Sequence, residues 1–193
     1  MGKLKQVYEA AEMLKELNLP VSLELLKEIE KLEEENGVEH REHLWTYAMQ
    51  QYFSFYTKLI MNIRQAKIHG ETIVAKPVLL LAMIDGIENG EFRSNEFRLT
   101  DLLEERYLAL MRQYRHSSQF DKPTDISNPY WHLQNDGFWK LLCIHKPSCG
   151  VTPSKKWLKD NVEYAYFDDD LWILLQNKTW RLRLQDFIVE KKL

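Results

Sequence analysis

NPYWHLQNDGFW, residues 128–139, decides how the centre of this chain is interpreted, because it surrounds the pair Asp136-Gly137 with aromatic side chains. Asp-Gly between runs of aromatic and branched residues is a strong hairpin signal, since Gly tolerates the positive φ of a primed turn. The pattern therefore predicts that residues 130–133 and 138–144 pair as antiparallel strands.

Strand alternation predicts two different faces for this hairpin. Pro129 has no N–H for a ladder and suits a strand edge. Tyr130, His132 and Gln134 fall together on the more polar face. Two interpretations stay open: a core hairpin whose polar residues simply face water, and a surface that contacts a ligand.

The composition is that of a globular protein, with 45% hydrophobic and 12% aromatic residues among 193. No apolar run approaches the roughly 20 residues of a membrane span, and the amphipathic start differs from a signal peptide. We therefore expect a cytoplasmic protein without a membrane partner. The net charge of −3 provides no global attraction to nucleic acid, so any such site must be a local patch.

The residues predict neither a metal site nor a cofactor. Cys143 and Cys149 are too few for a disulfide framework, and no second ligand pair completes a zinc site. His40 and His43 lie three apart without a third ligand, so they are interpreted as the start of a helix. No nucleophile elbow, Walker loop, dinucleotide fingerprint or zincin helix occurs, so we do not expect an enzyme.

Helical spacing predicts two short amphipathic helices at the N-terminus. The first runs from Lys3 to Leu19 and ends at Pro20. Ser22 caps the second, and Asn36-Gly37 supplies its left-handed end. The second helix is strongly acidic. We expect residues 1–38 to form a helical hairpin appended to the rest.

Residues 39–193 are predicted to form one α+β domain, mostly helical, with the hairpin as a wing-like element. Helices are expected over 39–67, 78–87, 100–114, 153–159 and 180–193, another opens at 168–170, and 162–167 alternates as a strand. Thr152-Pro153 is predicted to cap and begin the 153–159 helix. Residues 39–67 are apolar around most of the helix, which predicts a central position.

Basic residues gather at a few places outside the hairpin. Lys76 precedes a helix opened by Pro77, where backbone N–H groups can hold a phosphate. Other basic residues end the 100–114 helix or lie on the 153–159 helix, namely Arg112, Arg115, His116, Lys155 and Lys156. Cations also suit a helix C-terminus for electrostatic reasons alone. Combined with Tyr130, His132 and Gln134, they predict a surface that contacts phosphates and a groove.

These residues resemble a known family. KPVLLLA at 76–82, the helix after Thr100, and the 128–139 segment look like the N-terminal domain of HNH-type modification-dependent restriction endonucleases, whose relatives include sulfur-binding domains that recognise phosphorothioated DNA. The resemblance covers roughly residues 55–193. Those enzymes continue into a zinc-bearing nuclease domain, for which this chain to Leu193 leaves no room, so we do not expect it to cleave DNA by itself.

The resemblance implies roles for particular positions. Lys76 would contact the DNA backbone and Pro129 would form a pocket wall, with Tyr130 and His132 beside it. Ala75 stands where a second polar or basic residue is expected, and His132 is bulkier than a sulfur pocket prefers. Two readings follow: a DNA reader of another specificity, or a domain that has lost the pocket.

The leading hypothesis is a non-catalytic DNA-binding module, reading modified DNA in a prokaryotic restriction or defence setting. The rival is a protein-interaction adaptor, in which the acidic helices of residues 3–36 dock a protein partner or a second copy. An enzyme with an unrecognised site is the third alternative.

Overall fold

The computed structural model describes residues 2–68, 70–114, 123–145 and 151–193. It divides into an N-terminal unit, Met1–Phe55, and a C-terminal unit, Tyr56–Leu193. The boundary lies within helix α3 (Glu42–Met61). The separate character of residues 1–38 stays a prediction.

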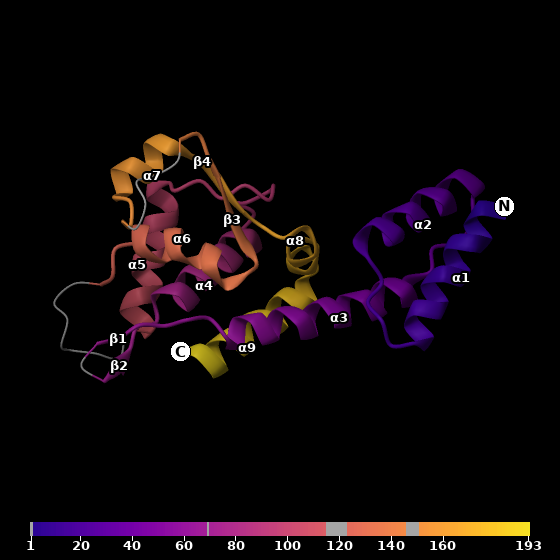
Figure 1. The fold of residues 1–193 in the computed structure, drawn as a ribbon, viewed down its shortest axis with the longest axis horizontal. Coiled ribbons are helices and arrows are strands. Elements are labelled where there is room, and N and C mark those ends of the chain that lie inside the picture. Colours follow the sequence, from indigo (N-terminus) through magenta and orange to yellow (C-terminus); the bar gives the residue numbers. More distant parts are fainter. Residues whose placement is uncertain (1, 69, 115–122, 146–150) are drawn as a thin grey trace. The chain divides into compact units, whose positions relative to one another are not determined.

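The N-terminal unit consists of α1 (Gly2–Glu16), α2 (Leu23–Asn36) and the first part of α3 (Figure 1). Its helical hairpin is confirmed together with the predicted signals at the ends of α2. The Ser22 hydroxyl accepts a hydrogen bond from the Leu25 N–H at 3.2 Å, and Gly37 adopts a φ of 62°. The Tyr52 hydroxyl donates to the Val21 carbonyl at 3.0 Å, which ties α3 to the chain before α2.

The C-terminal unit is organised around α4 (Ala75–Glu88), whose side chains are buried around nearly the whole helix. A helix that is apolar all round needs neighbours on every side. Here α4 contacts α5 (Asp101–Tyr114), α6 (Ser127–His132), α8 (Asp169–Gln176) and α9 (Lys178–Lys192) (Figure 1). Pro77 lies in the first turn of α4, where its missing N–H costs no helical hydrogen bond.

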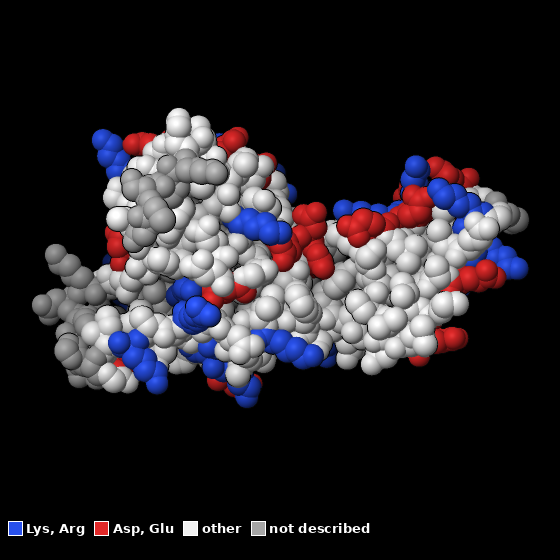
Figure 2. Space-filling view, viewed as in Figure 1, with Lys and Arg blue, Asp and Glu red and all other residues white. Residues whose placement is uncertain are grey.

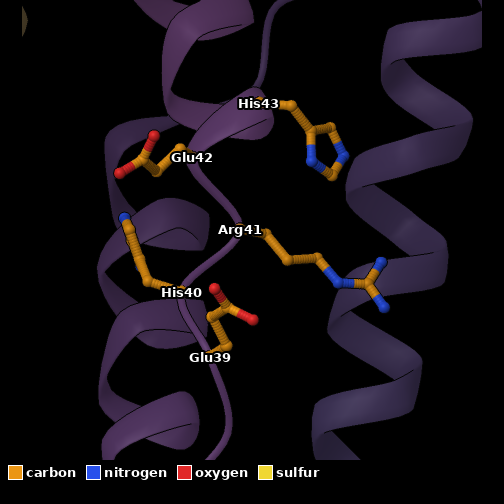
Figure 3. A pocket seen from close by; sticks show the side chains of 5 residues that line it. All are labelled: Glu39, His40, Arg41, Glu42 and His43. Atoms are coloured by element: carbon orange, nitrogen blue, oxygen red, sulfur yellow. The ribbon is translucent and has the colours of Figure 1, made fainter.

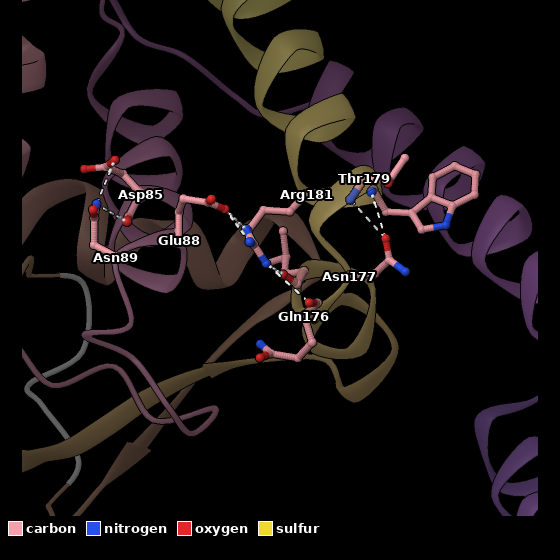
Figure 4. A network of polar contacts seen from close by, with 9 residues as sticks. Asp85, Glu88, Asn89, Gln176, Asn177, Thr179 and Arg181 are labelled. Carbon is pink, nitrogen blue, oxygen red and sulfur yellow. Dashed lines mark hydrogen bonds and ion pairs between the residues drawn. The ribbon is translucent and has the colours of Figure 1, made fainter.

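A buried arginine joins three of these helices, as Figure 4 shows. The Arg181 side chain on α9 is bonded to Glu88 at the end of α4, with 2.6 Å between Nε and Oε2. The same guanidinium donates from Nη1 to the Leu175 carbonyl at 2.7 Å and to the Gln176 carbonyl at 3.3 Å. It thereby satisfies carbonyls at the end of α8, which lack partners within that helix.

The strands of the C-terminal unit form small antiparallel pairs. β1 (Lys67–Ile68) pairs with β2 (Glu71–Thr72), and β3 (Trp139–Cys143) pairs with β4 (Val162–Phe167). A bridge from Phe97 to Ala165 adds a third segment beside β4. The β3–β4 pair contributes to an aromatic core that contains Phe97, Tyr130, Phe138, Trp139 and Phe167. The α+β class and the strand at 162–167 are confirmed.

The predicted hairpin is wrong. Residues 127–132 form helix α6, Leu133–Asp136 form a 3₁₀ turn called η1, and β3 pairs with β4 instead. The Asp125 side chain accepts from the Ser127 N–H at 2.9 Å and so starts a helix upstream of the segment. Gly137 does adopt the positive φ expected of it, 89°, but it ends η1.

Helix α7 (Lys155–Asn161) leads directly into β4. Its N-cap is Ser154, whose hydroxyl accepts from the Trp157 N–H at 3.2 Å, and not the predicted Thr152.

Among the described residues, no helix combines the length and apolarity that crossing a bilayer requires.

Candidate nucleic-acid interface

An ion pair links the first turn of α4 to the end of η1. The Lys76 Nζ lies 2.6 Å from the Asp136 Oδ2, and the side chains are only 13% and 3% exposed. The other carboxylate oxygen of Asp136 accepts a hydrogen bond from the Arg64 N–H at 3.2 Å. Asp136 thus anchors both Lys76 and the chain that follows α3.

His132, at the end of α6, lies in the same electrostatic environment. Its Nε2 is 2.7 Å from the Thr152 hydroxyl oxygen, and the residue is half-buried. Burial lowers the pKa of His132, the charge of Lys76 lowers it further, and the charge of Asp136 opposes both. The neutral imidazole is therefore favoured at neutral pH, and it can form hydrogen bonds without carrying a charge.

Lys192 near the end of α9 adds another cation. Burial lowers its pKa, and the charge of Asp136 opposes that shift. Its Nζ donates to the Met61 carbonyl at 3.1 Å. We call Lys76, His132, Asp136 and Lys192 the Lys76 cluster. Sequence reasoning identified Lys76 and His132 but missed Asp136, which it used only as a turn residue, and Lys192, which no local pattern connects to Lys76.

Most of the predicted contact residues in the 128–139 segment are buried or form hydrogen bonds within the domain. Tyr130 is fully buried, and its hydroxyl donates to the Phe97 carbonyl at 2.7 Å, so it does not face a groove as predicted. Pro129 is buried as well. Gln134 folds back and donates to the Trp131 carbonyl at 2.7 Å. The difference arises because α6 replaces the strand, and a helix turns successive side chains by about 100° rather than 180°.

Replacing Tyr130 with Phe tests this burial. We expect a loss of about 1 kcal/mol in the free energy of unfolding, because one buried hydrogen bond disappears while the Phe97 carbonyl keeps the Ala165 N–H as a donor. DNA affinity should not change. Urea denaturation measures the free energy of unfolding, and a binding titration measures the DNA affinity. Weaker binding at unchanged stability would indicate that Tyr130 does contact DNA.

The remaining predicted cations lie elsewhere on the C-terminal unit. Lys155 pairs with Glu104 on α5 and also lies 3.5 Å from the Asp125 carboxylate, so two carboxylates face this one cation. Arg112 and Lys156 are exposed and form no ion pair within the described residues. Arg115 and His116 lie outside the described residues.

The surface charge agrees with a local rather than a global site. On the face drawn in Figure 2, Lys and Arg are interspersed with Asp and Glu, and wide uncharged areas separate them. The net charge of −3 would repel a polyanion at long range. A polyanion could therefore be attracted only by a local group of cations.

The N-terminal unit contains a pocket lined by Glu39, His40, Arg41, Glu42 and His43 (Figure 3). Its basic side chains are engaged by neighbouring carboxylates. His40 Nδ1 is 2.6 Å from Glu33, and His43 Nε2 is 2.6 Å from Glu12. Within the described ranges, no group of three or more His, Cys, Asp or Glu side chains is arranged to hold a metal ion. The pocket is explained as a junction between helices.

The structure defines an α+β domain in which the Lys76–Asp136 ion pair joins the start of a buried helix to η1. The chain belongs to the ScoMcrA-like DNA sulfur-binding domain family, whose model matches residues 55–191. The resemblance inferred from the sequence is thereby confirmed. The match begins at the boundary between the two units, so α1 and α2 lie outside it.

Solved structures share the fold at low sequence identity. The sulfur-binding domain of ScoMcrA complexed with phosphorothioated DNA has 19% identity and a TM-score of 0.55, over 71% of this chain and 86% of that one. The SprMcrA sulfur-binding domain, also complexed with phosphorothioated DNA, has 16% identity and a TM-score of 0.52, over 72% and 85% of the two chains. No curated protein matches the chain in sequence.

Proposed function

We propose that this chain binds duplex DNA through the Lys76 cluster and reads a phosphorothioated backbone, in the cytoplasm of a prokaryote with a restriction or defence system. The observation that carries the proposal is the buried pair of Lys76 and Asp136, which joins the first turn of α4 to η1 directly after His132 at the end of α6, within a domain of the sulfur-binding family. Both structural relatives described above are complexes with phosphorothioated DNA.

The start of α4 is suited to an anion. Val74 at the N-cap forms no side-chain cap hydrogen bond, so the first-turn N–H groups lack the usual side-chain acceptor. The positive end of the helix dipole and the Lys76 ammonium then favour a phosphate at the same place. These contacts hold the backbone without reading sequence.

Recognition of sulfur needs a second kind of contact. Sulfur is softer and more polarizable than oxygen, so apolar carbon beside a cation favours it over the oxygen it replaces. Pro129 is a buried residue of α6, and half-buried Trp131 and His132 follow it in the same helix. His132 gives the proposed site a polar edge, and we expect it to tune which modified sequence binds.

Fluorescence anisotropy with two duplexes of the same sequence, one plain and one phosphorothioated, tests the function across a salt series. We expect tighter binding of the modified duplex. Lys76→Ala should weaken binding to both duplexes and reduce the slope of log affinity against log salt by about one.

Lys140→Ala is the matched control. Lys140 lies on β3, where it pairs with Asp168 at 2.5 Å outside the Lys76 cluster. Its replacement should leave the affinity and the salt slope nearly unchanged. Absence of binding to either duplex at low salt would contradict the proposed function.

The adaptor hypothesis remains the second candidate. Met13 on α1 and Leu17 directly after its end are 61% and 62% exposed, so the N-terminal unit presents apolar side chains to solvent. Docking of a protein partner or a second copy through residues 3–36 stays a prediction. A chain that binds no duplex would favour it.

A further inference from the structure

We infer that Asp136 is a positioning residue for DNA recognition: its buried carboxylate holds the Lys76 ammonium at the place where the DNA backbone docks. The inference rests on the proposed function. It predicts that removal of the negative charge of Asp136 weakens DNA binding, whereas simple electrostatics predicts that it strengthens binding. A carboxylate near a DNA phosphate repels it, whereas a carboxylate that fixes a DNA-contacting lysine strengthens binding.

The burial of the pair supports this role. Asp136 is the deeper partner at 3% exposure, and Lys76 is the shallower one at 13%. The carboxylate is therefore less accessible to a ligand than the ammonium. An anion that is more deeply buried than its cation can orient the cation while it stays shielded from a phosphate.

Asp136 is itself held rigidly. One carboxylate oxygen accepts from Lys76 and the other from the Arg64 N–H. The residue ends η1, and Gly137 follows it with a φ of 89°. Both oxygens and the backbone are thus fixed before any ligand arrives, which is the condition for a preorganised site.

The effect of this preorganisation on DNA affinity can be measured. Lysine has four rotatable side-chain bonds, and a free lysine loses that freedom when it binds a phosphate. Ordering a side chain of this kind changes affinity by about 2- to 10-fold. Asp136 removes that loss because Lys76 is ordered before binding.

Asp136→Asn separates the two effects. Asn is nearly isosteric, and its Oδ1 can still accept the Arg64 N–H, but it cannot form an ion pair with Lys76. If Asp136 positions Lys76, the phosphorothioated duplex should bind about 2- to 10-fold more weakly. If Asp136 only repels DNA, the affinity should rise.

Asp168→Asn is the control for the change in charge. Asp168 forms the comparable pair with Lys140, at 2.5 Å, and Asn is an equally good residue at the N-cap of α8. We expect this variant to bind DNA as tightly as the wild type or slightly more tightly. The inference is wrong if Asp136→Asn behaves like Asp168→Asn.

A double-mutant cycle with Lys76→Ala tests whether Asp136 acts through Lys76. Once Lys76 is absent, Asp136→Asn should no longer weaken binding, because residues in one network are non-additive. An equal loss in both backgrounds would indicate general structural damage and overturn the inference. Histidine NMR adds a local readout: the pKa of His132 should fall in Asp136→Asn, because the charge of Asp136 raises it.

The outcomes distinguish the inference from the function on which it rests. A wild-type chain that binds neither duplex overturns both. A wild-type chain that binds the modified duplex, with an Asp136→Asn variant of equal or higher affinity, overturns the positioning role alone.

Discussion

Replacing Arg181 with Ala should lower the free energy of unfolding of the C-terminal unit by about 2–4 kcal/mol, because it removes charge-assisted hydrogen bonds from a buried site. Arg181 is 8% exposed, and its guanidinium bonds to Glu88 and to two carbonyls at the end of α8. Without it, those carbonyls lose their donor, and α8 loses the hydrogen-bonded link through Arg181 to Glu88 on α4. Glu88 keeps partial access to water, which limits the loss.

Urea denaturation followed by tryptophan fluorescence measures this effect. Five of the six tryptophans lie in residues 56–193, so the signal reports mainly on the C-terminal unit. Arg183→Ala is the matched control, since Arg183 is exposed on the same helix and lies over the Trp180 ring at 4.9 Å. We expect that control to cost less than about 1 kcal/mol. Equal losses for the two variants would contradict the role of Arg181.

Replacing Glu33 with Ala should destabilise the N-terminal unit by about 2–4 kcal/mol, because it leaves buried donors without an acceptor. Glu33 is 2% exposed and accepts from the Tyr8 hydroxyl at 2.7 Å and from the Arg41 N–H at 3.1 Å. His40 Nδ1 lies 2.6 Å from its other oxygen. Amide hydrogen exchange of α1 and α2 gives the local stability, and exposed Glu34 supplies the control Glu34→Ala, for which we expect little change.

The same carboxylate makes this unit sensitive to acid. Burial by itself would raise the pKa of Glu33, but hydrogen bonds from Tyr8, His40 and the Arg41 backbone together lower it. A carboxyl whose pKa is lowered by folding contributes stability above its unfolded pKa, and that stability is lost as the pH falls through the folded pKa. The protection of α1 and α2 amides relative to their intrinsic exchange rates should therefore decrease below about pH 4.3, the unfolded pKa of Glu. Glu33→Gln should flatten this dependence, and an unchanged pH profile would contradict the assignment.

Most helices were predictable because their signals are local. Ser22 and Gly37 mark the ends of α2, and Thr100 accepts from the Leu103 N–H at 3.2 Å at the start of α5, as its position before Asp101 predicts. Each signal depends on hydrogen bonds between residues a few positions apart. Such bonds form in the same way wherever the helix docks.

The structure of the 128–139 segment could not be predicted from short-range sequence signals. Its Asp-Gly pair and aromatic residues are compatible with a hairpin, but α6 offers tertiary contacts that outweigh this preference. Tyr130 reaches the Phe97 carbonyl, and the Trp139 indole donates to the Tyr130 carbonyl at 3.0 Å. Neither contact has a sequence pattern, because the partners come from separate elements. The strand β3 still forms, but with β4 as its partner.

The sequence by itself determined the α+β class, most helix boundaries and the family, since these depend on residue type and short-range spacing, and it predicted Lys76 and His132 as contacts. Only the tertiary structure decided that Tyr130 is buried and that Asp136 and Lys192 join the Lys76 cluster. Lys76 and Asp136 are 60 positions apart, and they meet because α4 packs against α6, which leads directly into η1. The free energy that places them comes from packing of the whole C-terminal unit, which no short segment of the sequence contains.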